Sequence, residues 1–397
     1  MDYNFDKIID RRGTDSVKHD ILKSLYGRED IIPMWVADMD FEVPVFIREA
    51  VMQRAKHEVY GYTIRPKRFY ETIAGWLSAR HGWEVDPGQI DFSPGVVPAL
   101  VLAVLGFTEP GDKVLVQTPV YFPFFSSIEN HGRVLVNNQL CDEQGIYTID
   151  FSDLEEKFSK GVKMMLFCHP HNPVGRAWNK GELTQLAELA IKYNVLIISD
   201  EIHSDLLLFG HKHIPFTTIS NEIAMQTITC IAPSKTFNLA GLHTAAVVIQ
   251  NPALKKRYEK VLDDIHVGGG NLFGFVALEA AYTHGAAWLD QLNGYLEKNY
   301  LFLRNHLETE LPFVRVSPLE ATYLAWLNFE TLGMNDRELM KFMVAKAKVG
   351  LVDGPRFGAG GEQYLRMNIG TPQAVLKQAL EQITGAIREN LPEMFYI

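Results

Sequence analysis

Short apolar runs recur through the middle of the chain and alternate with segments of helical periodicity. The run Val-Leu-Ile-Ile at 195–198 is nearly continuous, whereas the segment 181–193 spaces its leucines three residues apart. Strands buried on both faces of a parallel sheet have such continuous runs. Alternation of strands with helices is typical of open α/β sheets. We therefore expect strands of one mostly parallel sheet at 113–117, 134–138, 163–168, 195–200, 227–231 and 245–249.

Helical spacing predicts helices at 98–107, 181–193 and 271–284. After residue 285 the pattern changes to a long amphipathic segment, which predicts a helix over 286–309. Short strands then follow at 313–316, 323–328 and 364–368. This mixture predicts a smaller α+β domain. We expect a large α/β domain over 46–285 and a small domain formed by 1–45 together with 286–397.

Composition narrows the functional classes. The 397 residues are 47% hydrophobic and 22% charged, so a large core is expected and disorder is not. With 38 basic and 48 acidic residues the net charge is −10, which argues against nucleic-acid binding. No apolar run is long enough for a membrane span, and the N-terminus does not resemble a secretory signal. Three cysteines without paired spacing favour a cytoplasmic setting.

Two candidate catalytic residues end or follow predicted strands. Lys235 follows the strand at 227–231, at the edge of the sheet where α/β proteins bind ligands. A lysine there can act as a nucleophile or Schiff-base former, or lie on the surface without function. Asp200 ends the strand at 195–200, where its buried carboxylate requires a cationic partner or caps the next helix.

Three further motifs lie at the same predicted edge. Asn172 could hydrogen-bond a ring oxygen or simply form a turn with Pro173. Gly95 precedes the helix at 98–107, where backbone N–H groups suit a phosphate, although an ordinary turn fits equally. Tyr121 could stack on a flat ring or pack in the core. Because all five motifs follow strands of one sheet, we expect them to assemble one pocket.

In this combination and order, the motifs resemble the fold-type I pyridoxal-phosphate (PLP) enzymes, the aspartate aminotransferase superfamily. More closely, the chain is similar to the cystathionine β-lyases and related carbon–sulfur lyases, a branch that includes the MalY/PatB-type proteins and cystalysin. The resemblance extends from residue 36 to Arg366. It rests on Val-Ala-Asp-Met-Asp-Phe at 36–41, Gly-Tyr-Thr at 61–63, Pro-Gly-Val-Val at 94–97, Thr-Pro-Val-Tyr at 118–121, His-Asn-Pro-Val-Gly at 171–175, Ser-Asp-Glu-Ile-His at 199–203, Ser-Lys-Thr-Phe-Asn at 234–238 and Thr-Tyr-Leu-Ala-Trp at 322–326.

The resemblance implies a fold-type I fold, PLP as cofactor and a role for each motif. Lys235 would hold the cofactor as a Schiff base and act as general base and acid, Asp200 would pair with the pyridinium nitrogen, and Tyr121 would stack on the ring. Arg366 would bind the substrate carboxylate beside Val36 and Ala37. The remaining cofactor contacts would come from Asn172, Gly95, Val96, Val97, Ser234, His203 and, across the interface of a homodimer, Tyr62.

The implied reaction is β-elimination from L-cystathionine or a related cysteine S-conjugate, which yields a thiol, pyruvate and ammonia. A class I/II aminotransferase would use the same residues, and a PLP-fold regulatory protein that acts through protein contact is a second alternative. Many aminotransferases have an Arg eight residues after the Schiff-base lysine, but this chain has His243. That departure favours the lyase branch.

Two other groups of residues suggest no further chemistry. Cys168, His169, His171 and His203 match no standard zinc spacing, so we expect no metal. Tyr323 and Trp326 are expected to pack within the small domain. We expect an amino-acid substrate, with no nucleic-acid or membrane partner.

Overall fold

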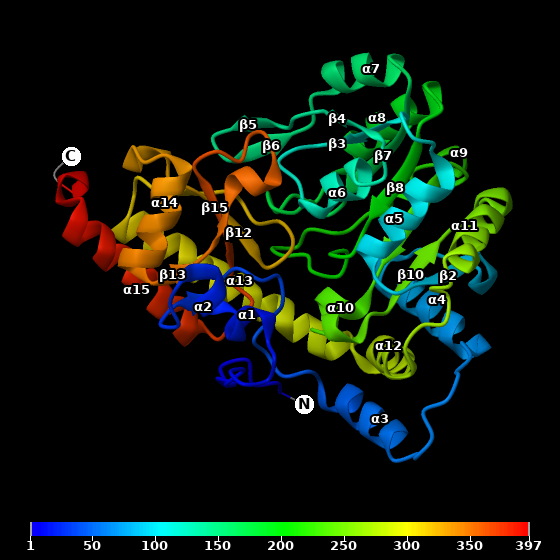
Figure 1. Cartoon of the computed structure of the whole chain (residues 1–397), viewed down its shortest axis with the longest axis horizontal. Coiled ribbons are helices and arrows are strands. Elements are labelled where there is room, and N and C mark those ends of the chain that lie inside the picture. The colour runs from blue at the N-terminus through cyan, green and yellow to red at the C-terminus, as the bar shows by residue number, and fades with distance from the viewer. Residues whose placement is uncertain (1, 396–397) are drawn as a thin grey trace.

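A seven-stranded sheet organises the larger lobe of the computed structural model, which describes residues 2–395 (Figure 1). The spatial order is β2-β10-β9-β8-β7-β3-β4, and β10 alone runs against the other six strands. The mostly parallel sheet that the apolar runs predict is thus confirmed. Its strands are β2 (Ile90–Ser93), β3 (Lys113–Val116), β4 (Val134–Asn137), β7 (Val162–Cys168), β8 (Leu196–Asp200), β9 (Thr227–Ile231) and β10 (Ala245–Val248).

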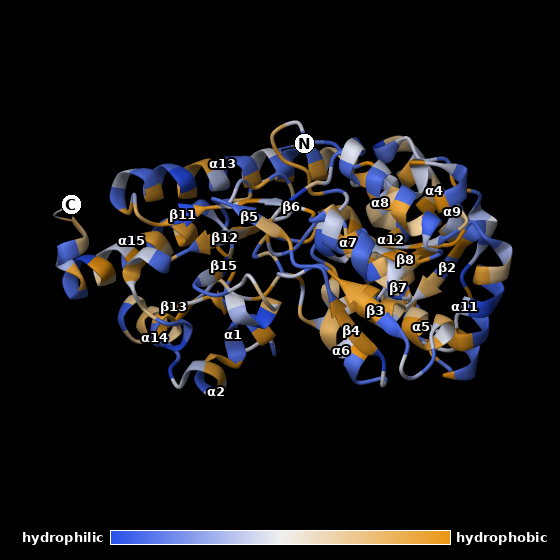
Figure 2. Cartoon of the chain, turned by 90° about the horizontal axis from the view of Figure 1, so that it is seen from above, coloured by the Kyte–Doolittle hydropathy of each residue, from blue (hydrophilic) through white to orange (hydrophobic). Residues whose placement is uncertain are grey.

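Strand β7 illustrates why these strands are apolar along their whole length. Met164 and Leu166 belong to a core cluster with helix α5 (Val96–Phe107). Met165 and Phe167, which alternate with them, belong to a second cluster that includes α8 (Lys180–Lys192). Both faces of the sheet are covered by helices, so neither set of side chains meets water. Figure 2 shows the resulting apolar strands between more polar helices.

The predicted strands of this sheet are confirmed, with ends that differ by at most one residue. Sequence analysis missed β2, which has only four residues and lies between Pro87–Gln89 and the Pro94-Gly95 turn. Helix α5 begins at Val96, two residues before the predicted start, because a proline at position 98 is tolerated in a helix's first turn. The other two predicted helices are α8 and α12 (Leu272–His284).

The smaller lobe contains α13 (Ala286–Glu310), which confirms the predicted long helix, and a four-stranded antiparallel sheet. That sheet has the order β11-β12-β15-β14. The N-terminal strand β1 (Ile32–Pro33) pairs in parallel with β13 (Val349–Gly350), so the start of the chain lies against its last third. The strands are β11 (Arg315–Val316), β12 (Leu324–Asn328), β14 (Val352–Asp353) and β15 (Tyr364–Asn368).

The remaining elements cover the two lobes and connect them. Helix α3 packs against α12 of the larger lobe, and α15 packs against α13. None of the helices in residues 2–395 combines the length and the apolar character that a membrane span needs. These elements are α1 (Val17–Asp20), α2 (Leu22–Tyr26), α3 (Val45–Ala55), α4 (Lys67–His81), α6 (Pro123–Glu129), β5 (Cys141–Glu143), β6 (Ile146–Thr148), α7 (Phe151–Ser159), α9 (Asn221–Ala224), α10 (Pro233–Thr236), α11 (Pro252–Asp264), α14 (Asp336–Phe342) and α15 (Gln373–Asn390).

Candidate active site

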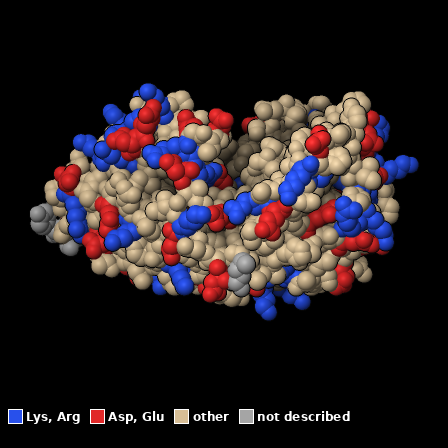
Figure 3. Space-filling view, turned by 90° about the horizontal axis from the view of Figure 1, so that it is seen from below, with Lys and Arg blue, Asp and Glu red and all other residues tan. Residues whose placement is uncertain are grey.

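A cavity of about 370 Å³ lies at the carboxyl ends of β7, β8 and β9. On the face drawn in Figure 3 the molecule is hollowed between its lobes, and charges of both signs are interspersed over the surrounding surface. A more open hollow of about 850 Å³ beside Arg65 and Lys255 contains none of the predicted site residues. Ten of those residues line the smaller cavity: Ala37, Gly95, Val96, Val97, Tyr121, Asn172, Asp200, His203, Ser234 and Lys235.

Lys235 lies in α10, a single turn of helix that follows β9. Its Nζ donates a hydrogen bond to the carbonyl oxygen of Ala37 at 2.6 Å. Burial, together with the positive charge of Arg366, lowers the pKa of Lys235 to about 8, and the opposing effects of Asp38 and Asp200 are smaller. Near neutral pH, its amine is therefore close to the point where it can release or accept a proton.

Asp200 is the last residue of β8, and the sheet register places it between Cys168 and Cys230. One carboxylate oxygen accepts a hydrogen bond from the backbone N–H of Ile202 at 3.2 Å, and no ion pair among the described residues includes it. Burial raises the pKa of Asp200 to about 7, although the Ile202 hydrogen bond and Lys235 oppose the shift. A cation in contact with Asp200 would restore its ionised form.

Arg366, from β15 of the smaller lobe, meets Asn172 at the cavity. Its Nη1 donates to Asn172 Oδ1 and its Nη2 to the Trp35 carbonyl, both at 3.0 Å, while its Nε has no partner. The guanidinium lies 5.0 Å from the centroid of the Phe357 ring. Burial lowers the pKa of Arg366 to about 10, so the group is still charged at neutral pH. A buried cation that contacts only neutral groups suits an anionic ligand.

Tyr121 and His203 place two neutral rings in the cavity wall. Burial raises the pKa of the Tyr121 phenol, so the phenol is neutral. His203 is buried, and burial followed by the charges of Lys235 and Arg366 lowers its pKa to about 3, so its imidazole is also neutral. The Nδ1 of His203 has no hydrogen-bond partner. Both side chains can pack on a flat ring without adding charge.

The N-terminus of α5 forms another part of the cavity wall, and Gly95 is its N-cap. Backbone N–H groups in the first turn of a helix have no intrahelical acceptor, and the helix dipole makes them attractive to anions. A Cβ atom on Gly95 would lie 3.2 Å from Cδ of Pro98, which is unusually tight. Ser234 and His243 also line this cavity.

The sequence matches the family of class I and II aminotransferases over residues 29–383. That span is most of the chain. The chain belongs to the aminotransferase class I and II family.

Individual relatives in this family match along nearly the whole chain. Cystathionine beta-lyase PatB of Bacillus subtilis is 46% identical, over 97% of this chain and 100% of that protein. A PLP-bound protein of Clostridium difficile 630, provisionally described as an aminotransferase, is 43% identical, and its structure superposes with a TM-score of 0.95. The match covers 97% of this chain and 100% of that one. Cystalysin of Treponema denticola, whose structure contains PLP, is 36% identical with a TM-score of 0.95. That match covers 98% of this chain and 100% of cystalysin. The family resemblance inferred from the motifs is confirmed.

Three predicted site residues of this aminotransferase-family chain do not line the cavity: Tyr62, Val36 and Arg366, of which Arg366 borders it through its hydrogen bond to Asn172. Tyr62 lies on the surface, with a relative exposure of 113%, and does not line the cavity. Val36 also lies outside the cavity lining, and its carbonyl accepts a hydrogen bond from Asn368 Nδ2 at 2.6 Å. Within one chain, the structure therefore does not bring Tyr62 to the site.

Sequence analysis missed the position of Tyr323. Its hydroxyl donates a hydrogen bond at 2.9 Å to the carbonyl of Ala37, the same oxygen that accepts from Lys235. The sequence did contain a signal for this position, because Tyr323 belongs to the segment 322–326, one of those that carry the family resemblance. Trp326 of that segment is buried and stacks on Tyr364, with ring centroids 4.9 Å apart.

The histidines next to Asn172 make hydrogen bonds to the backbone. The Nε2 atoms of His169 and His171 lie 2.9 Å from the carbonyls of Ile214 and Pro119, respectively. Burial lowers the pKa of His169 to about 3 and that of His171 to about 4, so each ring is neutral and donates through Nε2. Across residues 2–395, no group of three or more His, Cys, Asp or Glu side chains is arranged to hold a metal ion.

Proposed function

We propose that this protein is a PLP-dependent carbon–sulfur β-lyase that cleaves L-cystathionine or related cysteine S-conjugates to a thiol, pyruvate and ammonia. The observation that carries the proposal is the cavity in which Lys235, with a pKa of about 8, faces Asp200, with a pKa of about 7. The name and 46% identity of PatB support the reaction type.

The residues of the cavity fit PLP. Asp200 is buried and has no cation in contact, so the protonated ring nitrogen of the cofactor would complete its environment. The first turn of α5 offers backbone donors for a phosphate, at a place where a side chain on Gly95 would crowd Pro98. The PLP in the C. difficile and T. denticola structures supports the same cofactor here.

The side chains divide the task of binding the cofactor. PLP supplies an electron sink that stabilises negative charge at the substrate Cα. Lys235 would hold the cofactor covalently through Nζ, Asp200 would keep the ring nitrogen protonated, and Tyr121 would pack on the ring. The other contacts that we propose are Asn172 and His203 to the ring, and Gly95, Val96, Val97 and Ser234 to the phosphate.

Lys235 is also the group that we expect to move protons. Displaced by the substrate amine, Lys235 would be a free amine, and the pKa of about 8 that it has in the cofactor-free chain would suit removal of the Cα proton near neutral pH. The Ala37 carbonyl accepts one N–H of this amine and so limits the directions in which its lone pair can point. The Cβ–S bond would then break with its electron pair leaving on sulfur, and the proton that Lys235 took from Cα would be available to convert the departing thiolate to the thiol.

Arg366 would orient the substrate. Its charged guanidinium is held at both terminal nitrogens by Asn172 and Trp35, and Nε is free. A substrate carboxylate would supply the missing anion. Because Arg366 comes from the smaller lobe and Lys235 from the larger, such a substrate would contact both lobes.

A class I/II aminotransferase is the second candidate, and the provisional description of the C. difficile relative favours it. Both reactions begin with removal of the Cα proton by Lys235. They would differ in where Lys235 delivers that proton: to the departing sulfur in elimination, or towards the cofactor in transamination. His243, in place of the Arg of many aminotransferases, supports the lyase.

We further propose that two copies of the chain form a cytoplasmic homodimer. Val59, Tyr60, Tyr62 and Ile64 are exposed apolar or aromatic side chains in one short segment, as is typical of a protein interface. The three unpaired cysteines, at positions 141, 168 and 230, support a reducing compartment.

Mixing two inactive variants tests the dimer. If Tyr62 serves the site of the other subunit, Lys235→Ala and Tyr62→Phe chains that exchange at equal amounts recover about a quarter of the wild-type sites. No recovery would show that Tyr62 acts within its own chain or not at all. Each variant alone is the control.

One assay separates the two candidate reactions. Purified protein with PLP is given L-cystathionine, the absorbance spectrum is recorded, and pyruvate is measured by a coupled enzyme. A lyase releases pyruvate without an added keto acid. An aminotransferase converts the cofactor to its amine form and stops until a keto acid is added. A protein that shows no visible absorbance band with PLP would contradict the cofactor assignment.

A further inference from the structure

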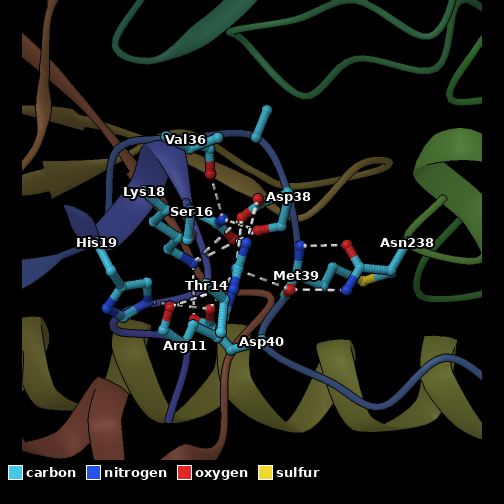
Figure 4. Close-up of polar contacts among 12 residues, drawn as sticks. Arg11, Thr14, Ser16, Lys18, His19, Val36, Asp38, Met39, Asp40 and Asn238 are labelled. Carbon is cyan, nitrogen blue, oxygen red and sulfur yellow. Dashed lines mark hydrogen bonds and ion pairs between the residues drawn. The ribbon is translucent and has the colours of Figure 1, made fainter. Parts of the chain in front are cut away.

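Four charged side chains outside the cavity form a cluster, fully buried at Lys18 and partly buried at the other three, that joins the N-terminal segment to the loop carrying Ala37 (Figure 4). Arg11 and Lys18 supply the positive charges, and Asp38 and Asp40 the negative ones. We name this group the N-terminal ion cluster. No step of the proposed reaction uses it.

Hydrogen-bonded ion pairs connect the four side chains of the N-terminal ion cluster. Arg11 donates to both carboxylate oxygens of Asp38, at 2.6 and 2.9 Å, and to Asp40 at 2.8 Å. Lys18 is fully buried, and its Nζ lies 2.7 Å from the other oxygen of Asp40. Burial alone would raise the pKa of Asp40, but Lys18, His19 and Arg11 together hold it well below its usual range.

The same loop is held along its backbone. The Nδ2 of Asn368 donates to the carbonyls of Val36 and Asp38, at 2.6 and 2.5 Å. Asn238 exchanges two hydrogen bonds with the backbone of Met39, at 3.0 and 2.8 Å. Between these anchored residues lies the carbonyl of Ala37, which accepts hydrogen bonds from both Lys235 and Tyr323.

We propose that Arg11 and Lys18 are positioning residues for Lys235. Through Asp38 and Asp40, they hold the 36–39 loop so that the Ala37 carbonyl stays within hydrogen-bond distance of the lysine Nζ. The proposal rests on the proposed function, because it assigns the N-terminal segment a part in setting the proton affinity and direction of the reacting amine.

The proton affinity of Lys235 makes the positioning role of Arg11 and Lys18 testable. A carbonyl acceptor and a nearby carboxylate both stabilise an ammonium ion, so the 36–39 loop raises the proton affinity of Lys235 through the Ala37 oxygen and Asp38. Loosening the loop removes both contributions while Arg366 and burial still oppose the charge. The charged or titratable groups around the amine are Asp38, Asp200, His203, Arg366 and Tyr323, whose hydroxyl donates to the same Ala37 oxygen.

Arg11→Met is the direct test, and Arg12→Met is its matched control. The two arginines are adjacent, but Arg12 pairs only with Asp10 at an exposed position. The full-length chain, freed of cofactor, is labelled competitively with acetic anhydride across a pH series, and the Lys235 peptide is quantified by mass spectrometry. We expect the labelling midpoint of Lys235 to fall by about 0.5–1 pH unit in Arg11→Met and to stay unchanged in Arg12→Met.

Kinetics of the loaded enzyme give a second readout. Because a mispositioned amine affects proton removal more than substrate binding, we expect kcat to fall about tenfold in Arg11→Met with little change in KM. Arg11→Lys keeps the charge but loses the paired hydrogen bonds to Asp38, so it should shift the labelling midpoint in the same direction by less. This milder variant carries the test if Arg11→Met does not fold.

Two failures remain distinguishable. Equal Lys235 midpoints in the Arg11 and Arg12 variants would overturn the positioning role, even if Arg11→Met is less stable to heat. A wild-type protein that binds no PLP or releases no pyruvate would instead contradict the proposed function. The labelling midpoint of Lys235 is measured without PLP and without pyruvate formation, so it tests the positioning role separately.

Discussion

Two buried groups of charges in this protein behave in opposite ways. In the cavity, the pKa of Lys235 falls to about 8 and that of Asp200 rises to about 7. In the N-terminal ion cluster, Asp38 and Asp40 raise the pKa of Arg11, and the pKa of Asp40 lies well below its usual range. Both regions are largely shielded from water, although Arg11, Asp38 and Asp40 are partly exposed. What differs is whether an opposite charge is in contact.

Direct pairing explains the difference. Arg11 and Lys18 each lie within 3 Å of a carboxylate oxygen, so attraction outweighs desolvation. Lys235 touches only a carbonyl, and Asp200 only a backbone N–H, so desolvation prevails. The same kinds of charged residue thus provide reactive groups in the cavity and fixed ion pairs between residues 11 and 40.

The largest expected effect comes from removing the reactive amine. Lys235→Ala should lower the rate of pyruvate formation about 10³-fold or more, because both the covalent attachment and the proton transfer are lost. The visible absorbance band of the cofactor should change as well. Lys212→Ala, on an exposed loop, is the control, and comparable loss in that variant would argue against a specific role for Lys235.

Lys18→Met is expected to be the most damaging change outside the cavity. It leaves Asp40 buried with one of its two cations, and breaking a buried pair costs about 3–5 kcal/mol of unfolding free energy. Denaturant titration measures this. A loss below about 1 kcal/mol would show that the N-terminal ion cluster is not tightly held.

Asp200→Asn should stabilise the cofactor-free protein at high pH. The carboxyl has a pKa of about 7 when folded and about 4 when unfolded, so the destabilisation that it causes grows from pH 4 to 7 and is complete above pH 7. Removing it should gain up to about 4 kcal/mol at pH 8, and the gain should shrink as pH falls from 7 to 4.

Unfolding curves of wild-type and Asp200→Asn protein at several pH values measure the difference. A gain that does not depend on pH would mean that Asp200 is not the titrating group. With PLP bound, the same variant should lose activity, because the ring nitrogen loses its anionic partner.

Lys7→Met gives the smallest expected effect and completes the comparison. Lys7 pairs with Glu42, but both side chains are about half exposed. Exposed pairs contribute about 0–1 kcal/mol, so denaturant titration should show little change. A loss as large as that of Lys18→Met would mean that burial does not set the strength of these pairs.

The cavity was largely predictable because of sheet geometry. The loops after β3, β7, β8 and β9 meet at one edge, so Tyr121, Asn172, Asp200 and Lys235 converge although 114 residues separate the first from the last. Arg366 lies in the other lobe, and only the family resemblance indicated it. Nothing in the local sequence predicts that contact.

The N-terminal ion cluster was not predictable. Arg11 and Lys18 meet Asp38 and Asp40 across a segment whose regular elements are only the short helices α1 and α2 and the two-residue strand β1, so no helix or strand period links their positions. Strand β2 was missed for a related reason, since four residues between turn-forming segments are too few for a pattern. Sequence periodicity predicts where regular helices and strands lie. It does not predict which side chains of short or irregular segments meet, and those contacts are seen only in the folded structure.

The reversed direction of β10 has a consequence for insertions and deletions. Because β10 starts at the cavity edge, the connection from β9 never leaves that edge, and it carries Ser234, Lys235, His243 and Thr244 into a single wall. Elsewhere, a helix separates neighbouring parallel strands and can absorb an added residue far from the cavity. Here one added residue would shift several cavity groups at once, so the length of this connection should tolerate less variation than its sequence.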